Sequence, residues 1–591
     1  MRILLLCHSF NSLSQRLYCE LAERGHQISV EYDISDAVSE EAVALFRPHL
    51  IIAPYLRRAI PASIWQAHTC FVVHPGIVGD QGPSALDWAI QNSEPTWGVS
   101  VLQATGELDG GPIWASENFP LRAARKSSVY REEVGAAASR AVLAAVERFA
   151  EGGFTPCPLA EVVCSPRGSR RPLMRQSDRV IDWQTATSAQ VLARLHAADG
   201  FPGVADELFG RPCRLYDAWP EDTLRGPPGE VIAWRETAIL RATADGAVWI
   251  GHVRCPDAAV PVKLPAAQVF AEELAALPEA PFVAAAHGSA ASTPDAAAED
   301  AQWAGLTPAG RTWQDICYEE ADAVGCLHFN FYNGAMSTRQ CRRLLAAYAW
   351  ACRRPTRVIV LFGGRDFWSN GIHLQQIEAA DSPADESWAN INALDDLAEA
   401  ILRSENHLTI AALQGNCAAG GCFLARAADL VWARAGIVLN PHYRNMGNLY
   451  GSEFWTYVLP RRVGSEAARA MLHERRPMSS AAGVASGFLD ASLSADAPAF
   501  RQAVMRRAAA AAAHPELPRR LQEKRARRQA DEASKPLAAY RAEELAEMQR
   551  NFYGFDPSYH VARHHFVFQT PHSWTPRHLA VHRDLAWTVP Q

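Results

Sequence analysis

Two polar side chains of the N-terminal half each follow an apolar segment, and their types suit chemistry that passes through an oxyanion. His74 ends the apolar part of CFVVHPGIVGDQGPSALDWAI, and Asp109 lies beside Gly110 and Gly111 after the apolar part of WGVSVLQATGELDGGPIWA. A transfer through a tetrahedral oxyanion needs one group that stabilises the charge and another that moves a proton. An imidazole and a carboxylate can fill these roles, although two polar groups in loops can also simply cap turns.

A second set of candidates lies in the C-terminal half, where glycines follow apolar segments. Gly371 belongs to RDFWSNGIHL, and the pair Gly420 and Gly421 belongs to LTIAALQGNCAAGGCFLARAADL. Glycine lets the backbone approach a ligand closely. Further on, NPHYRNMGNLYGSEFW is dense in polar and aromatic groups. These groups are candidates for a proton relay, or else for packing or gating, and they include Tyr443, Arg444, Tyr450 and Glu453.

The order of apolar and polar segments predicts a multidomain α/β protein that positions these residues. Residues 1–165 open with a β-α-β pattern that repeats, which predicts a parallel sheet with loops at the carboxyl ends of its strands. Residues 166–277 alternate in short segments between Gly, Pro and Asp-Gly turns, which is typical of a small β-barrel. We expect His74 and Asp109 to lie on loops of the first sheet.

The remaining chain divides into a linker, a second α/β domain and a helical end. Residues 278–308 are rich in Ala, Ser, Pro and acidic residues and have no apolar period, so they are interpreted as a linker. Residues 309–505 contain the fully apolar segments RVIVLFGG and LTIAALQG, which suit a sheet covered on both faces. Residues 506–591 are rich in Ala, Arg and Glu and are expected to form a helical C-terminal extension.

Composition limits the function classes. The formal net charge of -7 disfavours nucleic acid and anionic lipid as partners. No segment approaches the roughly 18 apolar residues that a membrane span needs, and the start does not resemble a signal peptide. The 13 cysteines form no CxxC pair and no zinc-type cluster, so we expect no metal site and no disulfides. A cytoplasmic protein acting on small molecules is therefore predicted.

The residues around His74 and Asp109 resemble the folate-dependent formyltransferases, which include the methionyl-tRNA and glycinamide ribonucleotide enzymes. The resemblance covers roughly residues 1–275 and implies a Rossmann-like domain followed by an OB-like barrel. The catalytic Asn-x-His pair and the later Asp of that family fall on Val72, His74 and Asp109. The Asn position is apolar here, and losing one oxyanion donor typically costs about a hundredfold in rate.

Two explanations for the missing donor stay open. Either another side chain substitutes, or the acceptor is a thiol, which attacks more readily than an amine. The candidate substitutes are Asn11, Gln15 and Gln81. The resemblance also implies that formyl-tetrahydrofolate is the donor and that its pterin is bound by the segment IIAPYLRRAIP, at Pro54, Tyr55 and Leu56.

The glycine-containing segments of the C-terminal half resemble the crotonase family, the enoyl-CoA hydratases and isomerases. This implies a crotonase fold and a coenzyme A thioester, whose oxygen is held by two backbone amides at Asn370 and Gly420, with Gly371 and Gly421 beside the ligand. The two glutamates of the hydratases correspond to Phe423 and, approximately, His442. Hydration of an enoyl-CoA is therefore not expected, because it needs carboxylates beside the water.

A formyltransferase half followed by a crotonase half is similar to the layout of the HypX (HoxX) hydrogenase-maturation proteins. The segments HPGIVGDQGPSALDWAI, NPHYRNMGNLYGSEFWTYVLP and RNFYGFDPSYHVAR carry this resemblance. It implies formyl transfer from formyl-tetrahydrofolate to coenzyme A, decarbonylation of formyl-CoA, delivery of CO to a [NiFe]-hydrogenase, and hydrogenase maturation proteins as partners. Two alternatives remain: a formyltransferase acting on an amine with an accessory CoA-binding domain, and a non-catalytic scaffold that binds folate and CoA.

Overall fold

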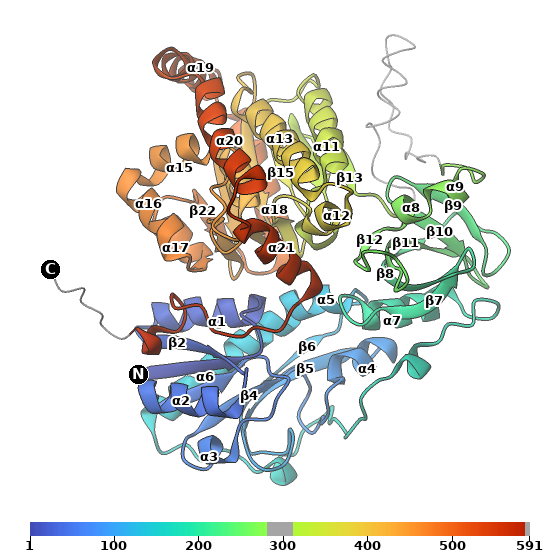
Figure 1. Ribbon diagram of the computed structural model, residues 1–591, viewed down its shortest axis with the longest axis vertical. Helices are drawn as coiled ribbons and strands as arrows, with labels where there is room; N and C mark the ends of the chain where they lie inside the picture. Colours follow the sequence, from blue (N-terminus) through green and yellow to red (C-terminus); the bar gives the residue numbers. More distant parts are fainter. Residues whose placement is uncertain (281–310, 585–591) are drawn as a thin grey trace.

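The computed structural model describes residues 1–280 and 311–584. Three domains follow one another along the chain, and a helical C-terminal segment leads from the third domain back to the first (Figure 1). Most of the linker predicted at residues 278–308 lies outside the described residues.

The N-terminal domain is built on a six-stranded sheet in the order β2-β1-β3-β4-β5-β6. Its strands are β1 (Arg2–Cys7), β2 (Gln27–Tyr32), β3 (Leu50–Ala53), β4 (Cys70–His74), β5 (Thr96–Gln103) and β6 (Ile113–Pro120). The first four strands are parallel, as expected, whereas β5 and β6 pair antiparallel and make the sheet mixed. The antiparallel β4–β5 pairing sets Gln103, the last residue of β5, opposite Phe71 near the start of β4, so the loop after β5 has to extend along the sheet to bring Asp109 to His74.

Helices surround this sheet, and the core is built mainly from aliphatic strand residues. The helices are α1 (Ser12–Glu23), α2 (Asp36–Phe46), α3 (Ala62–Trp65), α4 (Ala85–Gln91), α5 (Lys126–Val129) and α6 (Gly135–Glu151). A π-helical turn, Tyr130–Val134, joins α5 to α6. The side chains of Leu5, Val30 and Val142 are completely buried in this core. The carboxyl ends of the parallel strands are left to polar loops.

The middle domain is an antiparallel sheet with three short helices. Its strand order is β7-β8-β11-β10-β9, and β12 pairs with β11. The strands are β7 (Val204–Leu208), β8 (Arg211–Glu221), β9 (Val231–Arg235), β10 (Ala238–Ala242), β11 (Ala247–Arg254) and β12 (Leu264–Pro265). The helices are α7 (Ser188–Ala198), α8 (Ala266–Val269) and α9 (Ala271–Leu274).

The C-terminal domain contains two sheets, and its second, smaller sheet brings the glycine-rich segments together. The larger sheet has the strands β13 (Ile316–Ala321), β14 (Val324–Phe329), β15 (Val358–Phe362), β17 (Leu408–Leu413), β19 (Leu430–Arg434) and β22 (Ala491–Leu493). The smaller sheet has β16 (Phe367–Ser369), β18 (Asn416–Ala418), β20 (Val438–Asn440) and β21 (Met478–Ser479). β16 and β18 are paired, so the segments that follow them are neighbours.

The helices of this domain cover both sheets. They are α11 (Thr338–Ala351), α12 (Leu374–Ala379), α13 (Pro383–Leu402), α14 (Gly420–Arg426), α15 (Trp455–Val463), α16 (Ser465–Glu474), α17 (Ser480–Ala485) and α18 (Ala497–Ala513). The boundary predicted between residues 505 and 506 falls inside α18. Phe500 and Val504 of α18 are buried against the larger sheet, so this helix belongs to the domain core.

The helical extension consists of α19 (Leu517–Ser534), α20 (Leu537–Tyr553) and α21 (Ser558–Phe568). Beyond α21 the chain returns to the N-terminal domain (Figure 1), where Val30 N–H donates to the carbonyl oxygen of Leu579 at 3.0 Å. The buried Glu31 of β2 binds Arg583, with Oε2 2.7 Å from Nε. The end of the chain therefore holds the C-terminal half against β2 of the N-terminal domain.

Candidate functional site

In the N-terminal domain, an imidazole lies between two carboxylates. His74 is the last residue of β4 and is buried. Its Nε2 lies 2.9 Å from Asp80 Oδ1, and its Nδ1 lies 3.6 Å from Asp109 Oδ2. Asp109 has a φ of 52°, and its Oδ2 accepts a hydrogen bond from Gly82 N–H at 3.2 Å. The predicted pair, His74 and Asp109, is thus brought together by the loops that follow β4 and β5.

Asp80 is the member of this group that the sequence analysis missed. It is buried, and its Oδ2 has no hydrogen-bond partner among the described residues. A Cβ on Gly76 would come under 3.0 Å from His74 Nε2 and Asp80 Oδ1, so only glycine lets the two side chains meet here. The signal in the sequence was the Gly-Asp dipeptide in the loop after His74, which folds back on the strand end.

The three candidate substitutes for the missing Asn have different surroundings. Asn11 caps α1 by accepting from Ser14 N–H at 3.0 Å. Gln15 accepts from Asn440 Nδ2 at 2.9 Å, across to the C-terminal domain. Gln81 Nε2 lies 3.4 Å from the backbone oxygen of Asp109. Of the three, Gln81 is the residue that contacts the histidine–carboxylate group.

The residues predicted to line a folate pocket follow β3, at the carboxyl end of the parallel strands. Pro54 is buried, and Tyr55 and Leu56 are half-buried. The backbone oxygen of Tyr55 accepts from His8 N–H at 2.7 Å, which ties this loop to the end of β1. Val72 occupies the family's Asn position on β4, two residues before His74 and on the same face of the sheet.

The C-terminal domain has a pocket with about 470 Å³ of space free of protein atoms. It lies where the segments after β16 and β18 meet, and helices α13 and α20 close it. The lining residues include Gly371, Ile372, Ala419, Gly420, Tyr443, Glu453 and Met548. Met548 comes from α20, so the helical extension takes part in the site, which the sequence analysis did not predict.

Two backbone amides at this pocket are free to bind an oxygen, but one of them differs from the prediction. The Asn370 N–H donates to Gly334 O at 2.7 Å, so this amide is not available to a ligand and its assignment is corrected. The N–H groups of Ile372 and Gly420 have no acceptor within residues 1–280 and 311–584. Gly371 lies between them, since a Cβ there would be 3.3 Å from Gly420 N.

A buried cluster of carboxyl groups lies behind the amides. Glu453 contacts the Tyr443 hydroxyl through Oε2, and burial together with the neighbouring Asp395 raises its pKa well above the ordinary value. Burial also raises the pKa of Asp395, to about 6, but this carboxyl accepts from Ser452 Oγ at 2.6 Å and from Glu453 N–H at 2.8 Å. These donors and Arg541, at 3.8 Å, favour an anionic Asp395, so Glu453 is the carboxyl group of the pair that holds its proton more strongly.

The Tyr443 hydroxyl fits a protonated Glu453. It lies 2.9 Å from the Ser452 carbonyl oxygen and next to Glu453 Oε2, so two oxygens compete for one phenolic proton. If Glu453 donates to Tyr443, then Tyr443 can donate to Ser452 O, and both contacts are satisfied. The pocket thus holds a carboxyl group that can exchange a proton. Glu544, whose pKa burial raises to about 8, accepts from Phe454 N–H at 2.9 Å behind it.

Several predicted residues lie outside this arrangement. Tyr450 is 37% exposed, packs on Trp455 with ring centroids 5.3 Å apart, and does not line the pocket, so it is removed from the relay. Arg444 is exposed. Gly421 serves packing, because a Cβ there would come under 3.0 Å from Ser369 O.

The two positions of the missing glutamates hold side chains without a carboxyl group. Phe423 stacks on Tyr443 with ring centroids 5.0 Å apart. His442 is buried, and neither of its ring nitrogens has a partner in the described part of the chain. Burial lowers the pKa of His442 to about 4, with smaller contributions from His578 and Arg475. The arrangement is therefore not that of a hydratase.

The described ranges contain neither a metal-binding cluster nor a membrane helix. No cluster of three or more His, Cys, Asp or Glu side chains there could hold a metal ion. None of the helices that the structure describes combines the length and apolar character needed to cross a membrane.

Known proteins resemble both halves. The formyl transferase C-terminal domain family matches residues 173–261, and the enoyl-CoA hydratase/isomerase family matches residues 331–553. A methionyl-tRNA formyltransferase of Ralstonia nicotianae is 23% identical over 234 residues, which are 38% of this chain and 69% of that protein.

Two proteins resemble the whole chain. The hydrogenase maturation factor HoxX of Bradyrhizobium diazoefficiens is 51% identical over 585 residues, 99% of this chain and 97% of the relative. The crystal structure of HypX from Aquifex aeolicus in complex with tetrahydrofolic acid superposes with a TM-score of 0.92 at 44% identity and covers both chains completely. Because both proteins resemble this chain over almost its full length, the chain belongs to the HypX (HoxX) family of hydrogenase maturation factors.

Proposed function

We propose that this chain makes carbon monoxide for a [NiFe]-hydrogenase, with its two halves acting in sequence. The N-terminal half moves the formyl group of formyl-tetrahydrofolate to the thiol of coenzyme A, and the C-terminal half splits formyl-CoA into CO and coenzyme A. Support comes from the maturation role of the family, from the tetrahydrofolic acid bound to the Aquifex relative, and from the enoyl-CoA hydratase/isomerase match.

In the first step, the thiol sulfur bonds to the formyl carbon, the C–N bond to the folate breaks, and the thiol proton passes to the folate nitrogen. His74 moves this proton while Asp80 and Asp109 hold its ring from both sides. Gln81, which contacts Asp109, supplies a donor in place of the absent Asn. The folate is bound by the loop at Pro54, Tyr55 and Leu56.

In the second step, the formyl proton leaves carbon, the C–S bond breaks, and the proton is returned to sulfur. The amides of Ile372 and Gly420 hold the thioester oxygen, in place of the pair first assigned to Asn370 and Gly420. Glu453 accepts the formyl proton in its ionised form and passes it to the leaving thiolate, with Tyr443 as its hydrogen-bond partner. The products are CO and coenzyme A with its thiol restored.

The observation that carries this proposal is that one chain combines a histidine site of the formyltransferase type with a pocket suited to a thioester. That pocket has a buried carboxyl group but lacks the glutamates of the hydratases. The test is to incubate the purified protein with formyl-tetrahydrofolate and coenzyme A and to trap CO with deoxyhaemoglobin. CO should form only with both substrates, and a His74→Ala variant should make none. Formylated amine without any need for coenzyme A would instead favour an amine formyltransferase, and binding without turnover would favour a scaffold.

A further inference from the structure

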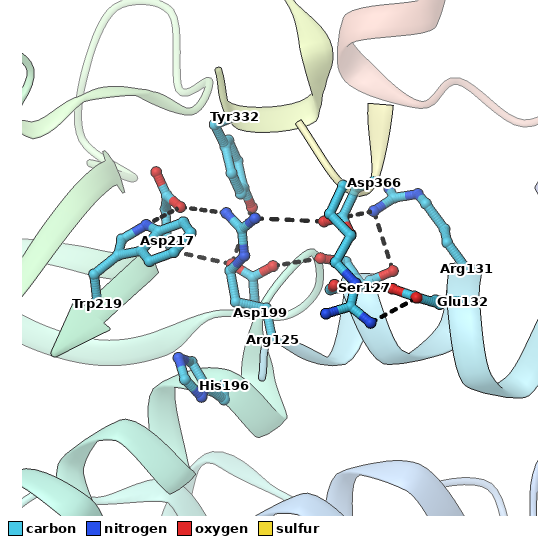
Figure 2. Close-up of polar contacts among 12 residues, drawn as sticks. Arg125, Ser127, Arg131, Glu132, His196, Asp199, Asp217, Trp219, Tyr332 and Asp366 are labelled. Atoms are coloured by element: carbon cyan, nitrogen blue, oxygen red, sulfur yellow. Dashed lines mark hydrogen bonds and ion pairs between the residues drawn. The ribbon is translucent and has the colours of Figure 1, made fainter. Parts of the chain in front are cut away.

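The three domains meet at a buried cluster of charged side chains that lies outside both proposed active sites (Figure 2). Its centre is Arg125, the residue before α5. The guanidinium of Arg125 contacts Asp217 of the middle domain and lies 3.4 Å from Asp366 Oδ2 of the C-terminal domain. The rings of Trp219 and Tyr332 flank it, with their centroids 4.9 and 5.4 Å from the guanidinium carbon. One side chain of the N-terminal domain thus binds both other domains.

The same cluster also fixes the middle domain. Asp199 accepts from Ser127 Oγ at 2.7 Å and from the Tyr332 hydroxyl at 3.1 Å, so it bridges the other two domains (Figure 2). Burial is the largest influence on the pKa of Asp217 and would raise it, but Arg125, His252 and Trp219 together outweigh burial and lower this pKa to about 2. Asp217 is therefore charged throughout the working pH range, and the contact with Arg125 is a lasting ion pair.

Two further contacts hold the segment beside Asp366. Glu132, in the π-helical turn after α5, binds Arg365 with Oε1 2.7 Å from Nη2. Arg131 lies over the Phe367 ring, 4.4 Å from its centroid. Asp366 Oδ1 has no donor among the described residues, so the two arginines provide the polar contacts of this carboxylate. Residues 365–367 are consequently positioned by residues 125–132 of the N-terminal domain.

The segment that contains Asp366 continues along the chain to one of the free pocket amides. Asp366 is followed by β16, Phe367–Ser369, and then by Gly371 and Ile372, which line the pocket. The opposite side is anchored in the same way, because Asn440 donates to Gln15 of α1 while its carbonyl oxygen accepts from Ala419 N–H at 2.9 Å. Ala419 immediately precedes Gly420. Both segments that carry a free amide are therefore held from the N-terminal domain.

Buried ion pairs contribute little net stability, since removing two charges from water costs about as much as their attraction returns. Their effect on geometry is larger, because a charged partner fixes a segment in one place, and a shift of roughly 1 Å at a reacting centre can cost about a hundredfold in rate. Within its own domain the segment next to Ile372 is held by Asn370 N–H, which donates to Gly334 O at 2.7 Å, and by Gly371 O, which accepts from Met336 N–H at 2.9 Å, and the ion pairs add its contacts with the N-terminal domain.

We propose that Arg125 and Asp366 are positioning residues for the thioester pocket, so that docking of the N-terminal domain sets the spacing of the Ile372 and Gly420 amides. The inference rests on the proposed function of that pocket. It makes the thioester pocket depend on the N-terminal domain for its geometry and not only for its supply of formyl-CoA. A protein that has lost the contact between Arg125 and Asp366 would still bind the thioester, but its Ile372 and Gly420 amides would polarise the thioester carbonyl poorly.

The test uses the full-length protein and two readouts, kcat for CO release and an infrared band whose position does not depend on the fraction of the protein that is folded. The Asp366→Asn variant is given formyl-CoA directly, and we expect kcat for CO release to fall about tenfold or more while KM changes less than about threefold. The second readout is the infrared carbonyl band of bound acetyl-CoA labelled with ¹³C at the carbonyl. In the wild type this band should lie below its position in water, and in Asp366→Asn it should move back towards that position.

Asp315→Asn is the matched control. Asp315 is a buried carboxylate at the boundary with the middle domain and binds Arg343 at 2.9 Å, but it does not contact the segments that carry the amides. It should leave both readouts unchanged. If Asp366→Asn does not fold, Glu132→Gln, which loses the contact with Arg365, should shift the band in the same direction.

An unchanged band and kcat in a folded Asp366→Asn or Glu132→Gln variant would overturn the inference, as would an equal effect in Asp315→Asn. Failure of the proposed function is distinguishable, because then the wild type itself would release no CO from formyl-CoA. The acetyl-CoA band still reports on the amides in that case.

Discussion

The carboxyl group of Glu453 lies directly against the backbone of Gly420, so close that a Cβ on Gly420 would come under 3.0 Å from Glu453 Oε1. Glu453 itself has a φ of 58°, an uncommon value for a residue with a side chain. The free amide and the proton-bearing carboxyl group are thus neighbours in the pocket. This proximity lets one side chain reach both the carbon and the sulfur of a thioester whose oxygen is bound at Gly420.

We expect the Gly420→Ala substitution to lower the rate of CO release from formyl-CoA about a hundredfold or more, because the added methyl group displaces Glu453 from the amide. Formyl transfer at His74 should be unaffected. Gly135→Ala in α6 is the control, since a Cβ there is 3.4 Å from its nearest neighbour, an ordinary contact. A Gly420→Ala protein with normal CO release would remove Glu453 and Gly420 from the mechanism.

The proton state of Glu453 predicts the pH dependence of the second step. Burial and the negative charge of Asp395 raise its pKa well above the ordinary value, so the ionised form that accepts the formyl proton becomes more abundant as pH rises. The rate of CO release from formyl-CoA should therefore increase with pH, and the increase should occur at higher pH than the titration of an ordinary glutamate. Stopped-flow detection of CO by haem absorbance measures this. A rate that falls with rising pH would mean that the protonated group acts instead.

Asp80 is expected to matter for formyl transfer although it was absent from the predicted site. Asp80→Asn keeps the shape but removes the charge that orients the His74 ring at 2.9 Å, and we expect the rate of tetrahydrofolate release to fall about 10- to 100-fold. Glu319→Gln is the control, because Glu319 contacts His328 at 3.0 Å in the C-terminal domain, in a similar pair away from the substrates. Equal rates in Asp80→Asn and wild type would contradict the role given to Asp80.

His442 should make the protein sensitive to acid. Its pKa falls from 6.5 to about 4 on folding, so between these values the unfolded chain binds more protons than the folded one. The free energy of unfolding should decrease as pH falls through this range, by up to about 1.4 kcal/mol per pH unit from this group. His442→Leu should lose stability more slowly between pH 6.5 and 4 in thermal melts.

His473→Leu provides the comparison for that experiment, because His473 is exposed on α16. Its melting temperature should follow the wild type at every pH. If His442→Leu also follows the wild type, the buried imidazole is not a source of acid instability.

The sequence alone could predict those candidate residues that lie at or after the end of a strand. His74 could be placed at a strand end because an apolar run followed by a polar residue marks such an end, and the strand ends of a parallel sheet carry sites. Asp109 follows β5, which is antiparallel, and was singled out by its turn with Gly110 and Gly111 and by the resemblance to the formyltransferases. Asp80 could not be predicted, since its approach to His74 depends on how the loop at Gly76 folds back. The Gly420 amide was assigned from the resemblance of LTIAALQGNCAAGGCFLARAADL to the crotonase family.

The remaining differences come from contacts between distant segments. The Asn370 amide was predicted to bind the ligand because nothing in RDFWSNGIHL shows that Gly334, 36 residues earlier, accepts a hydrogen bond from it. Asp395 of α13 reaches Glu453, and Met548 of α20 reaches the pocket, through helices that only tertiary packing brings near. Tyr450 has the right type and a suitable place in the chain, but its ring packs outward on Trp455.

The central claim is that formyl-CoA, loaded at His74, is the compound consumed beside Gly420. The most direct measurement uses the Glu453→Gln variant with formyl-tetrahydrofolate labelled with ¹³C in the formyl group, quenched in acid and analysed by mass spectrometry. We predict that labelled formyl-CoA accumulates while little CO is released, and that a His74→Ala, Glu453→Gln double variant forms no labelled formyl-CoA. Absence of labelled formyl-CoA in Glu453→Gln, with the wild type still releasing labelled CO, would contradict the account.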